Sequence, residues 1–148
     1  MVWDHLHAFS TPSSLRDIDF AYFNPIDMDA GAQERVQAQL QAALPGAPWE
    51  AINQATVHLW FEQHFGHAVA PLRSLHEAVA SWPEYATSIA LTLSSDGELQ
   101  VIAPHGLTDL FSMRVRRNPA RVSVETYRQR IEDKRYTERW PKVTVVGV

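Results

Sequence analysis

The sequence predicts an α+β or mixed α/β fold, in which a mixed sheet is flanked by helices. Three observations favour this class. Segments with the apolar spacing of amphipathic helices alternate with short runs rich in β-branched and aromatic residues. A hairpin over residues 89–102, with Asp96-Gly97 at its turn, interrupts that alternation. The six glycines form no phosphate-binding loop of either common spacing, so a doubly wound nucleotide-binding fold is not expected.

The first third of the chain is predicted to contain two helices with a strand between them. Residues 2–8 have the spacing of a short helix, and residues 17–23 have the aromatic and β-branched content of a strand. Asp27 or Asp29 can cap the next helix, which runs to about Leu44. Glutamines supply the polar coverage of this helix, at Gln33, Gln37, Gln39 and Gln41.

The later elements follow from caps, breaks and apolar runs. Asn53 and Ser123 are good helix caps, and Gly66 is a good helix end. The expected elements are a strand over 48–52, helices over 53–65 and 74–82, the hairpin, a helical turn over 108–111, an extended segment over 113–115, a final helix over 123–139 and a strand over 143–146.

Composition bounds the class of protein. The chain of 148 residues is long enough for one domain, and 45% apolar with 20% charged residues is ordinary for a folded soluble protein. The absence of cysteine excludes disulfides, zinc–thiolate sites and cysteine nucleophiles, and it fits a reducing cytoplasm. No apolar run approaches the ~20 residues that span a bilayer. We therefore expect a cytoplasmic protein without a membrane partner.

Charge is distributed unevenly along the chain, whose net charge is −4. Ten of the 13 Lys and Arg residues lie between Arg114 and Lys142, and 13 of the 17 Asp and Glu residues precede that segment. A basic segment can bind nucleic acid as an adaptor, here through Arg128, Arg135 and Arg139 on one helical stripe. Acidic residues within the same segment favour instead a salt-bridged, solvated face.

Asp17 and Asp19 are the candidate site residues that stand out first. Strand side chains alternate between two faces, so these carboxylates share one face, roughly 6.5–7 Å apart at Cα. The other face is apolar and presents Ile18, Phe20 and Tyr22. Two carboxylates at that separation repel unless a cation lies between them, and Mg²⁺ prefers such oxygen ligands. The alternative is a solvated strand end that binds no metal.

An ordered series of stretches accompanies the acidic strand. It consists of Val2-Trp3-Asp4-His5-Leu6-His7, Leu15 to Phe23, Pro48 to Ala55, Val57 to Trp60, Phe65 to His67, Ala103 to Phe111 and Arg116 to Pro119. The series covers nearly the whole chain and resembles a nucleotidyltransferase-like family of small proteins in the DNA polymerase beta superfamily. An Asp-x-Asp pair alone is a weak signal, whereas the ordered series is specific.

The resemblance implies a mixed sheet that presents three carboxylates to divalent cations, Mg²⁺ or Mn²⁺. Asp17 and Asp19 would supply two of them. Glu50 opens the short strand after the intervening helix, and it would supply the third carboxylate or act as a base. The implied reaction transfers a nucleoside monophosphate from a nucleoside triphosphate to an acceptor that the sequence does not identify. We expect residues 1–148 to form a single nucleotidyltransferase-like domain.

The chain departs from the family pattern in two places. The family carries a Gly with a nearby Arg-Asn upstream of the first Asp, and we expect that segment to lie upstream of Met1. After the Glu50 position the family carries a Lys and an Arg, where this chain has Ile52 and Thr56. Because cations bind triphosphates, this difference predicts weaker substrate binding. The alternative function is a catalytically inactive nucleotide- or protein-binding module on the same scaffold.

Other features carry less weight. His58, His64 and His67 lack the four-residue spacing of a helical zinc site, and no Gly-x-Ser-x-Gly motif of a serine hydrolase is present. Trp3 and Leu6 would lie on a helix that lacks its beginning, so we expect exposed apolar surface there and self-association of the chain.

Overall fold

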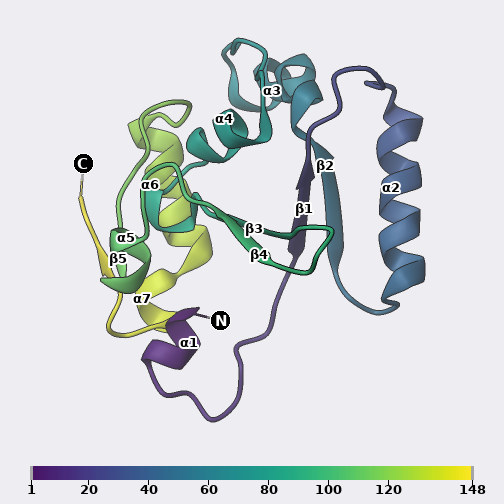
Figure 1. Ribbon diagram of the computed structural model, residues 1–148. Helices are drawn as coiled ribbons and strands as arrows, with labels where there is room; N and C mark the ends of the chain where they lie inside the picture. The colour runs from purple at the N-terminus through teal and green to yellow at the C-terminus, as the bar shows by residue number, and fades with distance from the viewer. Residues whose placement is uncertain (1, 148) are drawn as a thin grey trace. The chain divides into compact units, whose positions relative to one another are not determined.

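The computed structural model describes residues 2–147, and it divides into two compact units. We call Ser14–Ala78 the middle unit, and Met1–Ser13 together with Val79–Val148 the terminal unit. Figure 1 shows the chain with its helices and strands labelled. Each unit has a hydrophobic cluster of its own. The expectation of a single domain over residues 1–148 stays a prediction.

A parallel pair of strands and the helix that connects them organise the middle unit. Its elements are β1 (Ile18–Tyr22), α2 (Ala30–Ala43), β2 (Trp49–Asn53), the 3-10 turn η1 (Gln54–Thr56), α3 (Val57–Phe65) and α4 (Leu75–Ala80), which ends in the terminal unit. β1 and β2 pair in parallel, with Ile18 opposite Trp49 and Tyr22 opposite Asn53. Parallel neighbours need a crossover connection, and α2 supplies it.

Most of the predicted boundaries in this unit are confirmed. The N–H of Ala55 donates to the Asn53 side chain at 3.2 Å, and Gly66 ends α3 with a φ of 75°. Asp29 holds the N-cap position of α2, although its side chain makes no capping hydrogen bond. The strand predicted over residues 17–23 begins at Ile18, so Asp17 lies just before it.

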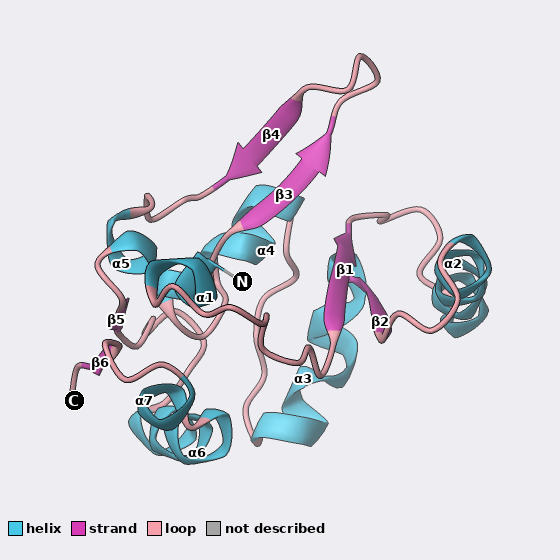
Figure 2. Ribbon diagram, turned by 90° about the horizontal axis from the view of Figure 1, so that it is seen from below, coloured by secondary structure: helices cyan, strands magenta, loops and turns pink. Residues whose placement is uncertain are grey.

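The outer edge of β2 is covered by α2, which lies on the side away from β1 in Figures 1 and 2. Gln37 Nε2 donates to the Trp49 carbonyl at 2.6 Å, and the Ala51 N–H donates to Gln37 Oε1 at 2.8 Å. The Asn53 N–H donates to Gln33 Oε1 at 3.0 Å. Beyond the polar coverage that the sequence predicts, these two glutamines therefore bond the edge of β2. Their amides satisfy backbone groups that a third strand would otherwise pair.

The hydrophobic cluster of the middle unit is built from α3, α4 and the segment between them. Val57 and Phe61 are buried, as the apolar stripe of α3 predicts, and they pack with Leu72 and Ala78. Phe65 in the last turn of α3 contacts the Phe61 ring at a centroid distance of 4.5 Å but stays 46% exposed. The apolar stripe of α3 is therefore buried in the first part of the helix and exposed at its end.

The terminal unit contains two separate two-stranded sheets and several short helices. β3 (Ala90–Leu93) and β4 (Leu99–Ile102) pair antiparallel, and β5 (Arg114–Val115) and β6 (Thr144–Val145) pair in parallel, so the mixed α/β class is confirmed. Its elements are α1 (Val2–Leu6), the 3-10 turn η2 (Tyr85–Thr87), β3 (Ala90–Leu93), β4 (Leu99–Ile102), α5 (Thr108–Phe111), β5 (Arg114–Val115), α6 (Val124–Lys134), α7 (Tyr136–Arg139) and β6 (Thr144–Val145).

Trp3 lies at the centre of the terminal unit's core. Its side chain is 5% exposed, its Nε1 donates to the Leu110 carbonyl at 2.7 Å, and its ring meets Trp140 edge-on at a centroid distance of 5.2 Å. Leu6 packs against the same cluster. The expectation that Trp3 and Leu6 form an exposed apolar surface is therefore wrong, because the C-terminal helices cover them.

The basic C-terminal segment forms two helices, where the sequence predicts one over residues 123–139. Ser123 caps α6 as predicted and accepts a hydrogen bond from the Thr126 N–H at 3.0 Å. Arg135 then adopts a left-handed conformation with a φ of 50° and ends the helix. The proposed stripe of Arg128, Arg135 and Arg139 is consequently interrupted, because Arg139 belongs to α7.

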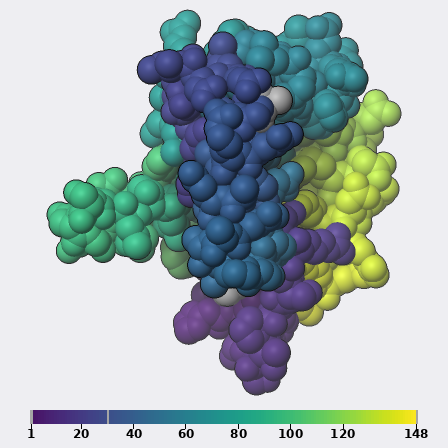
Figure 3. Space-filling model, turned by 90° about the vertical axis from the view of Figure 1, so that its right-hand side faces the viewer, coloured from purple at the N-terminus to yellow at the C-terminus, as the bar shows by residue number. Residues whose placement is uncertain are grey.

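The predicted hairpin is confirmed, and its turn contains Gly97 with a φ of 84°. It projects away from the helices of its unit in Figure 2 and forms the green protrusion in Figure 3. One face carries two cross-strand apolar pairs, Leu91 with Val101 and Leu93 with Leu99. These side chains are between 48% and 69% exposed. The largest exposed apolar surface of the terminal unit's sheets is therefore on this hairpin.

Candidate active site

Asp19 and Glu50 occupy paired positions on the two strands of the middle unit. Asp19 is the second residue of β1, Glu50 is the second residue of β2, and the register sets them opposite each other. Register partners in a parallel pair point to the same face of the sheet, and adjacent strands lie about 4.8 Å apart. Both residues are exposed. The structure thus brings these two sequence-predicted carboxylates side by side.

The opposite face of the same strands is apolar. The alternation predicted for Glu50 and Ile52 on one face, with Trp49 and Ala51 on the other, is confirmed by the register. Ala51 is buried, and burial together with the Asp27 carboxylate raises the pKa of the Tyr22 hydroxyl. The face opposite the carboxylates is therefore only partly covered, with Phe20 still 39% exposed, and the carboxylate face carries exposed Asp19 and Glu50 beside partly buried Ile52.

Asp17 stands apart from this pair. It is exposed and lies directly before Ile18, outside the regular strand whose alternation would fix its direction. Within residues 2–147, no group of three or more His, Cys, Asp or Glu side chains is arranged to hold a metal ion. The arrangement thus pairs Asp19 with Glu50 and does not gather all three carboxylates into one cluster.

The Asp19–Glu50 pair nevertheless has donors that suit a divalent cation. Carboxylate oxygens are the ligands that Mg²⁺ prefers, and Mg²⁺ commonly uses one or two protein carboxylates while it keeps several waters. Two exposed, adjacent carboxylates leave room for such waters and for a phosphate group. The pair therefore suits one cation, and among residues 2–147 no third His, Cys, Asp or Glu ligand is in place.

Asn53 fixes the chain at the far end of the strand pair. Its side chain is 2% exposed, accepts the Asn24 N–H at 3.0 Å and donates to the Asn24 carbonyl at 2.9 Å. It also accepts the N–H of Ala55 at the start of η1. The sequence identifies Asn53 only as a helix cap, whereas the structure shows that it also ties the end of β1 to the end of β2.

Two positions where the family pattern carries cations have structural roles in this chain. Ile52 is partly buried and packs against the cluster around Val57 and Phe61. Thr56 Oγ1 donates to the Asn53 carbonyl at 2.8 Å within the turn that starts α3. In this chain the first position therefore serves packing and the second a turn hydrogen bond.

Two later stretches of the resemblance, Ala103 to Phe111 and Arg116 to Pro119, contact each other in the terminal unit. Arg116 Nε donates to the Asp109 carboxylate at 2.7 Å, and its guanidinium lies over the Tyr85 ring, 4.9 Å from the centroid. His105 contacts the same ring and bonds the Ala80 carbonyl at 2.9 Å through Nε2. These contacts join α5, β5 and the end of α4, so we assign them to the stability of this unit.

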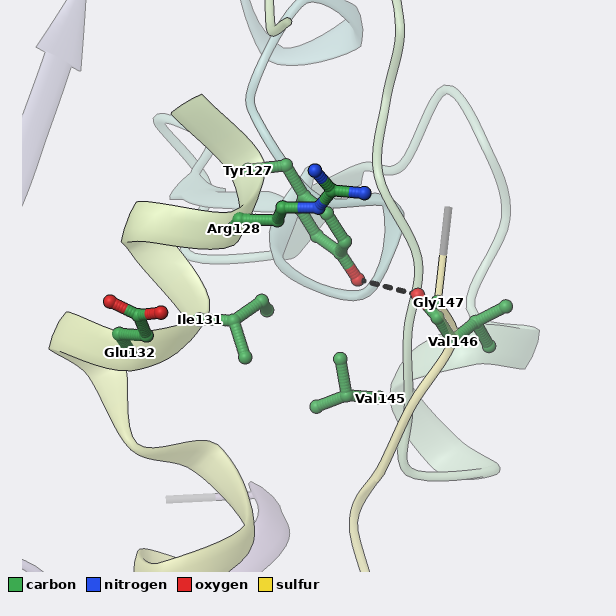
Figure 4. Close-up of a pocket in the computed structure, with 7 residues that line it drawn as sticks. All are labelled: Tyr127, Arg128, Ile131, Glu132, Val145, Val146 and Gly147. Atoms are coloured by element: carbon green, nitrogen blue, oxygen red, sulfur yellow. Dashed lines mark hydrogen bonds between the residues drawn. The ribbon is translucent and has the colours of Figure 1, made fainter. Parts of the chain in front are cut away.

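An open cavity of about 320 Å³ lies against α6 and β6 in the terminal unit. Figure 4 shows its lining, in which Tyr127 donates through its hydroxyl to the Val146 carbonyl at 3.1 Å. Among the residues that line it, Glu132 is the one carboxylate, so it lacks the paired acidic groups of the middle unit.

No helix within residues 2–147 has the length and apolar character that a membrane span requires.

Comparisons with known proteins bear on the whole chain. A family model described as Nucleotidyltransferase matches residues 1–145. A solved NMR structure described as revealing a CCA-adding enzyme head domain is 26% identical in sequence and superposes with a TM-score of 0.78. That similarity covers 99% of this chain and 76% of the other. No curated protein matches the chain.

Proposed function

The chain belongs to this nucleotidyltransferase family, and we propose that it transfers a nucleoside monophosphate from a nucleoside triphosphate to an acceptor with the help of Mg²⁺ or Mn²⁺. Family membership supports nucleotidyl transfer in general. The observation that carries the finer proposal is the register pairing of Asp19 with Glu50 on the exposed face of the strand pair.

The proposed roles follow from charge and position. Asp19 and Glu50 would hold a divalent cation, and Asp17, immediately before β1, would orient its waters. Such a cation neutralises phosphate charge and helps an acceptor hydroxyl lose its proton. Because Ile52 and Thr56 replace the cations of the family pattern, we expect a high KM for the triphosphate.

The set of donor nucleotides to test can be narrowed for a first experiment. The similar solved structure is described as a CCA-adding enzyme head domain, so CTP and ATP are the triphosphates to test first. We propose incubation of the protein with each labelled triphosphate, Mn²⁺ and a cell extract that supplies acceptors. The measurement is transfer of label to RNA, protein or small molecules, separated before counting.

Variants of the carboxylates test the assignment. Asp19→Asn and Glu50→Gln should each lower label transfer at least 100-fold, because either removes half of the paired charge. Glu34→Gln, an exposed carboxylate on α2, is the matched control and should leave transfer unchanged. Wild-type protein that binds CTP or ATP but transfers no label to any fraction would contradict the enzyme and favour a binding module.

Self-association is a further part of the proposal. The covered position of Trp3 removes the original reason for expecting it, and the exposed apolar face of the β3–β4 hairpin supplies another. A two-stranded hairpin is marginally stable alone in water, so an apolar face of this kind gains stability when a second copy covers it.

A further inference from the structure

Gln37 makes hydrogen bonds to the peptide groups on both sides of Glu50. Its Nε2 donates to the carbonyl of Trp49 at 2.6 Å, and its Oε1 accepts the N–H of Ala51 at 2.8 Å. In a parallel ladder, alternate residues of a strand bond the same neighbour, so the groups of Trp49 and Ala51 face away from β1. One side chain on α2 thus takes the place of a neighbouring strand at this point of β2.

These bonds hold β2 at the residue whose carboxylate faces Asp19. The strand can twist or slip only if the Gln37 amide releases a donor, an acceptor or both. A primary amide suits this task because it carries a donor and an acceptor about two bonds apart, whereas Glu lacks the donor and Met lacks both. The amide therefore constrains the pleat of β2, and with it the direction in which the Glu50 side chain leaves the strand.

We infer that Gln37 is a positioning residue, which holds Glu50 opposite Asp19 and so sets the geometry of the cation pair. The inference rests on the proposed function, in which Glu50 is a metal ligand. It goes beyond that function by placing a determinant of the site on α2, which contributes none of the carboxylates. Partners outside the ligand shell of a metal commonly change its affinity by about 10–100-fold when they are removed.

Gln33 provides an internal control for the same kind of bond. It lies one helical turn before Gln37, and its Oε1 accepts the Asn53 N–H at 3.0 Å on the same edge of β2. Asn53 is three residues beyond Glu50, and its side chain is held by other bonds. Loss of the Gln33 amide should therefore weaken the strand edge without releasing Glu50.

The experiment compares Gln37→Met with Gln33→Met in the full chain. Mn²⁺ affinity is measured by calorimetry, and the backbone φ and side-chain χ1 angles of Glu50 are followed by NMR scalar couplings in the metal-free protein. We expect Gln37→Met to weaken Mn²⁺ binding by about tenfold or more and to change the Glu50 couplings. Gln33→Met should change Mn²⁺ affinity less than threefold and leave the Glu50 couplings as in wild type.

The NMR measurement keeps the inference separate from the proposed function. If wild-type protein binds no Mn²⁺, the metal-dependent function fails, and the Glu50 couplings alone decide the positioning role. Glu50 couplings unaltered by Gln37→Met, or altered equally by Gln33→Met, would overturn the inference. If Gln37→Met does not fold, Gln37→Glu replaces it, because a carboxylate keeps the bond from Ala51 and loses the one to Trp49. Gln37→Glu is then compared with Gln33→Met in the same two measurements.

Discussion

Glu84 and Arg130, 46 residues apart in sequence, form a two-point ion pair inside the terminal unit. Arg130 Nε lies 2.8 Å from Glu84 Oε1, and Arg130 Nη2 lies 3.1 Å from Glu84 Oε2. The Glu84 side chain is 1% exposed. Thr87 Oγ1 also donates to Oε2 at 3.3 Å. The pair ties α6 to the segment before η2.

Removal of Arg130 should therefore destabilise the protein strongly. Arg130→Met leaves the Glu84 carboxylate buried without its cation, and such losses cost about 3–5 kcal/mol in the free energy of unfolding. Urea unfolding followed by far-UV circular dichroism measures this change. The double variant Glu84→Gln/Arg130→Met should be more stable than Arg130→Met alone. A single variant within about 0.5 kcal/mol of wild type would contradict a paired, buried carboxylate.

Asp4 should make the stability of the terminal unit sensitive to acid. Its carboxylate accepts bonds from Ser13 Oγ at 2.6 Å and from Trp140 Nε1 at 2.7 Å. These hydrogen bonds hold the pKa of Asp4 well below its usual value of 3.8, and the bond from Ser13 has the largest effect. A lowered native pKa contributes stability that is fully present above the usual value and is lost as pH falls below it.

Asp4→Asn tests this contribution. The neutral amide cannot accept the same set of charge-assisted bonds, so we expect a loss of about 1–3 kcal/mol at pH 7. The difference between variant and wild type should shrink as the pH falls below about 4, where the wild-type carboxylate begins to lose its advantage. Urea unfolding at several pH values between 2 and 7 measures it. Parallel pH profiles for the two proteins would count against the assignment.

The Asp19–Glu50 pair should make thermal stability depend on divalent cations. A cation that binds only the folded state raises Tm with its concentration, by about 1.4 kcal/mol of stability at ten times Kd. Asp19→Asn should abolish this response to Mg²⁺ or Mn²⁺.

Scanning calorimetry distinguishes these outcomes when Tm is measured without metal and then at metal concentrations that rise in 10-fold steps. Glu34→Gln serves as the control and should keep the wild-type response to metal. An equal rise of Tm in Asp19→Asn and wild type would mean that the cation binds elsewhere. No response in wild type would support a solvated strand end.

The hairpin should govern self-association. Leu93→Thr together with Leu99→Thr removes one cross-strand apolar pair while keeping strand propensity, so the variant should stay monomeric at higher concentration than wild type. Thr92→Ser, on the opposite face of β3, is the matched control. Sedimentation velocity over a 100-fold range of protein concentration measures the change. Wild type that remains a monomer throughout would refute the prediction, as would equal association of all three proteins.

Local signals in the sequence were sufficient for most elements of the fold. Asn53 and Ser123 cap helices, Gly66 ends one, and Asp96-Gly97 turns the hairpin, because each of these preferences acts within a few residues. Period-two alternation likewise predicts which face of its strand carries Asp19 and which carries Glu50. The resemblance series then indicated the family, which the match over residues 1–145 confirms.

Tertiary structure decided which of these surfaces meet. Alternation gives the face of a strand but not its register, so only the parallel pairing sets Asp19 opposite Glu50. The four-residue spacing of Gln33 and Gln37 showed that they share a helix face, yet an amide bonds water as readily as a strand edge until the chain brings that edge near. The same holds for Asp4 and Trp140, which are 136 residues apart. The type of a polar side chain determines which donors and acceptors it offers. Its actual hydrogen-bond partner is determined by the folded chain, because that partner lies far away in sequence.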